Sequence, residues 1–150
     1  MRRTFILIAV ILSLAGLASC DKPLTVEQRI IATIRNMEAQ IEEGERAAFM
    51  KHIAPDFTAQ NDAMNRDQVR AFVIFQMNRH KNLSAQLFPI RVTGAGDSAT
   101  AHFKALVTGG PGLLPESGQV FEFETHWRLV DDEWLLQTAN WSPNIFDDVY

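Results

Sequence analysis

The segment that decides the fold reads WRLVDDEWLL and spans residues 127–136. Two apolar stretches, each with its own tryptophan, flank a pair of adjacent aspartates. This pattern is typical of two antiparallel strands joined by a tight turn. We therefore expect a hairpin made of the strands Val120–Val130 and Glu133–Ser142, with Asp131 and Asp132 at the turn.

The residues before this hairpin predict two further strands and, earlier still, helices. The strands are Ala85–Thr93, interrupted at Pro89, and Ser98–Thr108, which leads into the glycine- and proline-rich loop Gly109–Gly118. Three helices are expected first: one from the capping box at Thr25, one over Glu45–Ile53 that ends at Pro55, and one from Asn65. Helices followed by an antiparallel meander indicate the α+β class.

The first helix has a clear apolar stripe. Its members recur at helical spacing and are Ile30, Ile34, Met37 and Ile41. Arg29, Glu38 and Glu42 are expected on the other side of the helix.

The chain resembles the nuclear transport factor 2-like superfamily, a cone-shaped fold shared with polyketide-cyclase-like and ketosteroid-isomerase-like proteins. The resemblance rests on GERAAF (44–49) leading to PDF (55–57), and on the 127–136 hairpin. That hairpin follows the family's W-R…D-G-E-W pattern, with Asp132 where glycine is usual. The resemblance covers residues 25–142 and leaves 143–150 as a C-terminal tail. It implies three N-terminal helices on a curved antiparallel sheet of four or more strands.

In this family the helices and the concave face of the sheet enclose a pocket. The apolar alternate residues of Val120–Val130 are expected to face it, and three alanines of Ser98–Thr108 leave space for a small apolar ligand. A filled core is the alternative. The expected pocket residues are Phe72, Phe103, Phe121, Phe123, Trp127 and Trp141.

An acid–base enzyme on this fold needs a histidine or carboxylate inside the apolar pocket, where burial shifts its pKa. The sequence assigns no catalytic residue, and the candidates for that role are His52, Asp56 and Asp62. His102 and His126 are expected to pair with carboxylates across strands on the outward face. The scattered histidines have no metal-ligand spacing, so neither a metal nor a cofactor is expected.

The N-terminal segment resembles the signal peptide of a bacterial lipoprotein. Arg2 and Arg3 precede an apolar run, and LASC (17–20) resembles the lipobox, whose cysteine is acylated and becomes the first mature residue. The resemblance implies a signal peptide at residues 1–19, palmitate on Cys20 and a tether at residues 20–24. An ordinary secretory peptide or short anchor is the alternative. We expect the periplasmic face of the cell envelope, and Asp21 favours the inner membrane.

Charge narrows the choice of partners. Removal of residues 1–19 takes 2 of 14 basic residues and none of the 18 acidic ones, which leaves 12 against 18, a net charge of −6. An acidic chain without a basic run lacks the positive charge that attracts phosphate backbones. Nucleic acid is therefore not an expected partner. The outward strip is self-complementary in charge and predicts a homodimer. It contains Glu122, Glu124, His126 and Arg128.

The sequence therefore predicts a lipid-anchored envelope protein whose cone binds a small apolar ligand or a partner protein without catalysis. One alternative is an isomerase, dehydratase or cyclase that uses a pocket histidine or aspartate. Another is an accessory subunit of an envelope or secretion assembly, with Leu113 and Leu114 in the Gly109–Gly118 loop as its contact.

Overall fold

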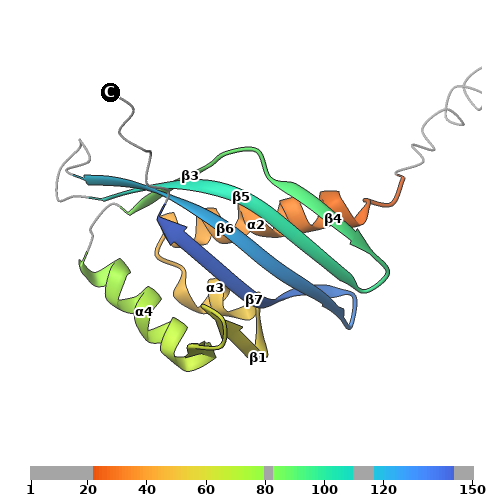
Figure 1. Ribbon diagram of the computed structural model, residues 1–150, viewed down its shortest axis with the longest axis horizontal. Coiled ribbons are helices and arrows are strands. Elements are labelled where there is room, and N and C mark those ends of the chain that lie inside the picture. The colour runs from red at the N-terminus through yellow and green to blue at the C-terminus, as the bar shows by residue number, and fades with distance from the viewer. Residues whose placement is uncertain (1–21, 80–82, 110–116, 144–150) are drawn as a thin grey trace, which may run out of the picture.

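The computed structural model describes residues 22–79, 83–109 and 117–143 (Figure 1). The described helices are α2 (Val26–Glu42), α3 (Arg46–Lys51) and α4 (Arg66–Arg79). The strands are β1 (Ile53–Ala59), β2 (Met64–Asn65), β3 (Ser84–Leu87), β4 (Arg91–Ala95), β5 (Ser98–Gly109), β6 (Ser117–Val130) and β7 (Glu133–Pro143). They form one sheet in the order β2-β1-β7-β6-β5-β3, with β4 also paired to β5. The predicted α+β cone fold is confirmed, as a large curved sheet that does not close on itself.

Helix α2 begins at the predicted capping box. The Thr25 side chain accepts a hydrogen bond from the Gln28 amide at 3.2 Å, and the Gln28 side chain accepts one from the Thr25 amide at 3.0 Å. Its apolar stripe packs onto the sheet, with Ile30, Ile34 and Met37 buried. None of the helices in the described ranges is long and apolar enough to cross a membrane.

The β6–β7 hairpin turns where the sequence predicts. Asp131 and Asp132 have φ values of 49° and 64°, in the left-handed region. A two-residue turn of this kind needs positive φ at both positions, which explains why glycine is usual at the position of Asp132. Arg29 ties the start of α2 to this turn, because its guanidinium donates to the Asp132 carbonyl and to its carboxylate at 3.1 Å.

Three local predictions are wrong. The second helix ends at Lys51, and the segment expected to continue it is the parallel partner of β7, with Ile53 opposite Leu136. The sheet is therefore not wholly antiparallel. Pro55 is tolerated in β1 because the β1–β7 register shifts between Ile53 and Thr58. The single strand expected over residues 85–93 is two strands, β3 and β4, which lie on either side of Pro89 and both pair with β5.

A buried hydrogen-bonded pair lies on the inward face of β6. The Trp127 indole donates to the Thr125 hydroxyl at 2.9 Å, and this hydroxyl donates to the Ala101 carbonyl at 3.1 Å. Thr125 and Trp127 are both 3% exposed. The hydroxyl thus satisfies two buried polar groups at once.

Gly94 in the β4–β5 hairpin has no room for a side chain. A Cβ there would lie 2.7 Å from the Ala99 Cβ and 2.7 Å from the Ser98 carbonyl oxygen. We expect Gly94→Ala to lower the free energy of unfolding by about 1–3 kcal/mol through overpacking, measured by urea denaturation. Gly96→Asn is the control, since Gly96 has open space and a φ of 61° that asparagine tolerates. Equal losses in the two variants would contradict the steric explanation.

The Thr125 hydroxyl gives a second stability prediction. Thr125→Val leaves the Trp127 N–H without its acceptor, and we expect a loss of about 1–3 kcal/mol. In a Trp127→Phe background, the residue at position 127 has no N–H that loses its acceptor. Thr125→Val should therefore lower the free energy of unfolding clearly less in that background. Chemical denaturation of the two single variants and the double variant measures this coupling. Strictly additive losses would show that the hydrogen bond does not account for the effect.

Candidate functional site

A cavity of about 310 Å³ lies between the helices and the concave face of the sheet. Helices α2, α3 and α4 and strands β1, β3, β5, β6 and β7 all contribute to its wall. Among the described wall residues all side chains are apolar except those of Glu38, Gln76 and Thr125. A cavity of this size with an apolar wall is suited to a small apolar ligand.

Aromatic rings form a continuous row along the wall. The ring centroids of Phe103 and Phe123 are 5.1 Å apart with planes 7° from parallel. Trp141 lies 6.2 Å from Phe123 on one side and 6.2 Å from Phe72 on the other. The row therefore runs from β5 across β6 and β7 to α4, and most of the rings expected in the pocket belong to it.

Five of the six predicted pocket residues line the cavity: Phe72, Phe103, Phe121, Phe123 and Trp141. Trp127 does not. It points inward, as its strand position requires, but it belongs to the buried core together with Ile30, Ala99 and Ala101. The part of the concave face near the β6–β7 turn is thus filled by core side chains, whereas the part near the first residues of β6 borders the cavity.

Glu38 is an ionisable wall residue that the sequence did not identify. It was expected on the solvent side of α2, yet its side chain is only 16% exposed. Glu38 follows Met37 at the edge of the apolar stripe, and that position was the available signal. Its side chain lines the cavity, and its carboxylate is hydrogen-bonded to two partners.

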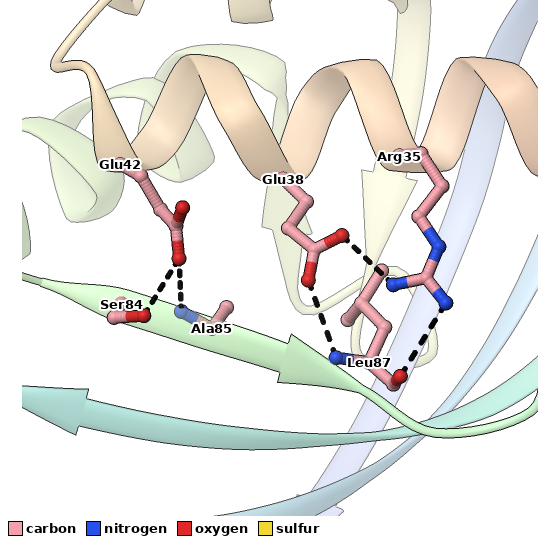
Figure 2. Close-up of polar contacts among 6 residues, drawn as sticks. All are labelled: Arg35, Glu38, Glu42, Ser84, Ala85 and Leu87. Carbon is pink, nitrogen blue, oxygen red and sulfur yellow. Dashed lines mark hydrogen bonds and ion pairs between the residues drawn. The ribbon is translucent and has the colours of Figure 1, made fainter.

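Figure 2 shows those partners on α2 and β3. Glu38 accepts hydrogen bonds from Arg35 at 2.9 Å and from the backbone amide of Leu87 at 3.2 Å. Glu42 accepts from the Ser84 hydroxyl at 2.6 Å and from the Ala85 amide at 3.2 Å. These carboxylates occupy the free edge of β3, where a neighbouring strand would otherwise supply carbonyl groups.

The three catalytic candidates lie outside the wall of the cavity. His52 ends α3 half-buried, with its Nε2 3.3 Å from the Asn36 amide nitrogen. Burial lowers the pKa of His52, and the nearby charge of Glu133 opposes that shift. Asp56 accepts from Arg128 at 3.0 Å and is 56% exposed, and Asp62 is exposed in the turn after β1.

The outward face of β5 and β6 carries charged side chains that contact one another. Lys104 contacts Glu122 at 2.8 Å. Glu124 lies 3.8 Å from His102 across the strand pair and 3.4 Å from His126 of its own strand. The cross-strand neighbour of His126 is Thr100 at 3.0 Å, so the expected cross-strand carboxylate is found for His102 and not for His126. The expected separation of an apolar inner face from a charged outer face is therefore confirmed for these strands.

The described residues offer no metal site, and several predicted positions lie outside them. No group of three or more His, Cys, Asp or Glu among the described residues could hold a metal ion. Cys20, Asp21, Leu113 and Leu114 lie outside the described residues, as do the signal segment and most of the tail.

No protein-family model and no curated protein matches this sequence. Solved structures do. An NTF2-like protein of unknown function from Pseudomonas putida KT2440 is 20% identical, over 77% of this chain and 84% of that one, with a TM-score of 0.67. An NTF2-like protein with a cystatin-like fold from Novosphingobium aromaticivorans is 18% identical over 80% and 82%, with a TM-score of 0.65. A protein of the NTF2-like family from Streptomyces avermitilis, provisionally named a dehydratase, is 14% identical over 78% and 95%, with a TM-score of 0.67. Together with the cavity, these likenesses show that the chain has the NTF2-like fold.

Proposed function

We propose that this protein is a lipid-anchored component of the bacterial cell envelope that binds a small apolar ligand in its cone without converting it. The observation that carries the proposal is the cavity of about 310 Å³, whose described wall offers no free acid or base. The Glu38 carboxylate is held by Arg35 and the Leu87 amide, and the Thr125 hydroxyl already joins Trp127 to Ala101. Burial of apolar surface is then the main source of affinity.

The enzymatic alternative has less support. It requires a group on the wall that moves a proton, within hydrogen-bond reach of the ligand. His52, Asp56 and Asp62 do not line the cavity, and Glu38 is the only ionisable side chain among the described wall residues. The accessory-subunit alternative and the homodimer through the outward face stay predictions.

A substitution that fills the cavity tests ligand binding. Ala85 is half-buried on β3 and lines the cavity, so Ala85→Phe places a ring inside it. We expect the dissociation constant of the neutral fluorophore N-phenyl-1-naphthylamine to rise about tenfold or more, since the bulk of one ring excludes a comparable part of the ligand. The measurement is a fluorescence titration of the purified chain.

Ala32→Phe is the matched control, because Ala32 is exposed on α2 and does not line the cavity. It should bind the fluorophore as the unmodified chain does. Binding that is absent from the unmodified chain, or unchanged by Ala85→Phe, would contradict a ligand site in the cone.

Lipid attachment is tested separately. Cells that express the full chain should incorporate radiolabelled palmitate into it, and Cys20→Ala should abolish that incorporation, because Cys20 is the single cysteine. Two acyl chains would suffice for stable anchoring where one is marginal. Equal labelling of the unmodified chain and of Cys20→Ala would contradict the lipid anchor and would leave the proposed ligand site unaffected.

A further inference from the structure

Helix α4 exposes large apolar side chains. Phe75 is 55% exposed and Phe72 is 42% exposed. Ala71, one helical turn before Phe75, is exposed as well. These residues form an apolar face on the outside of the helix, and Phe72 also belongs to the rim of the cavity.

The charge near this face is basic in an otherwise acidic protein. Helices α3 and α4 contain five arginine and lysine residues and one acidic residue, Asp67, whereas the whole chain has a net charge of −4. Arg66 is used internally, since it donates to the carbonyls of Met50 and Ile53. Arg70 and Arg79 are exposed and form no ion pair within the described residues.

Arg79 lies over the ring of Phe75, with its guanidinium carbon 5.8 Å from the ring centroid. An aromatic ring beside an unpaired arginine is the combination that suits the boundary between phospholipid headgroups and acyl chains. The ring enters the apolar layer while the guanidinium stays at the phosphates. An anionic surface attracts such arginines and a neutral one does not.

We propose that α4 docks on an anionic phospholipid bilayer, with Phe75 inserted and Arg70 and Arg79 at the phosphates, so that the cavity takes its apolar ligand from the membrane. This inference rests on the proposed function. Five residues of α4 line the cavity: Val69, Phe72, Val73, Gln76 and Met77. A ligand that leaves the lipid beside α4 would therefore reach the cavity without crossing open water.

The predicted anchor is compatible with this orientation. In Figure 1 the start of α2 lies at the right and α4 at the lower left, so the two lie toward opposite ends of the long axis. Helix α2 alone spans 17 residues, or about 25 Å. A domain that lies with its long axis along the bilayer brings both its tethered end and α4 to the lipid. Leu24, 60% exposed beside the tether, adds an apolar contact at the tethered end.

The test uses the full lipidated chain, reconstituted into vesicles of phosphatidylcholine alone or mixed with phosphatidylglycerol. Ala71→Cys carries an environment-sensitive NBD fluorophore on the docking face, and spin-labelled lipid is the quencher. We expect a blue-shifted emission and lipid quenching at residue 71 in the mixed vesicles only. Thr93→Cys, labelled in the same way, is the control, because Thr93 is exposed on β4 opposite Thr100 and should stay in water in both.

Three further variants and one control identify the contact in the labelled background. Arg70→Gln and Arg79→Gln should each weaken docking about fivefold, the effect expected from one basic residue at an anionic surface. Arg91→Gln, an exposed arginine on β4, should leave docking unchanged. Phe75→Ser should lower quenching in the mixed vesicles while the protein stays attached.

The outcomes separate the two proposals. If the chain floats with the vesicles but residue 71 reads as aqueous in both compositions, the docking proposal is wrong and the anchor stands. Docking that Arg70→Gln, Arg79→Gln and Phe75→Ser all leave unchanged would also overturn it, since another surface would then be responsible. Failure to float at all would overturn both docking and anchoring, whereas binding of the fluorophore in the cavity is measured without membranes.

Discussion

The close packing of α2 on the small residues of the sheet determines where the molecule is solid and where it is hollow. Ile30 is fully buried in a core that includes Ala99 and Ala101 on β5. Small side chains let the helix approach the sheet there, and the remaining space is filled by Trp127 and Trp134. Further along the sheet, α2 and α4 both border the concave face of β5, β6 and β7, and a cavity remains between the helices and the strands. The placement of α2 on the sheet thus determines where the core is packed and where the cavity lies.

The hollow half needs support that packing alone does not give. Strand β3 is only four residues long and pairs with β5 on one edge. Its other edge is held by Glu38 and Glu42 of α2, which accept backbone and hydroxyl hydrogen bonds (Figure 2). Charge-assisted bonds of this kind are stronger than neutral ones, so they fix the width of the wall. The same bonds occupy the Glu38 carboxylate, which otherwise would be free to act on a ligand.

Much of this arrangement follows from local sequence patterns. The capping box at Thr25, the turn at Asp131 and Asp132 and the alternation along β6 each have one physical solution, and the structure adopts it. The parallel β1–β7 pair could not be predicted, because it joins residues about 80 positions apart and Pro55 suggests a break instead. The burial of Trp127 in the core was missed for a similar reason. Strand alternation says which face a side chain is on, but only the position of α2 says what covers it.

The apolar wall sets an upper limit on how tightly a ligand is held. A molecule that fills about 310 Å³ buries on the order of 250 Å² of apolar surface, which contributes about 6 kcal/mol. Even with no offset, about 6 kcal/mol corresponds to a dissociation constant on the order of 40 μM. Loss of translational and rotational freedom weakens binding from water further. Weak retention suits a protein that exchanges its ligand. It also favours a source in which the apolar ligand is already concentrated, and a lipid bilayer beside α4 is such a source. The exposed rings and unpaired arginines of α4 are thereby connected to the size and chemistry of the cavity that they border.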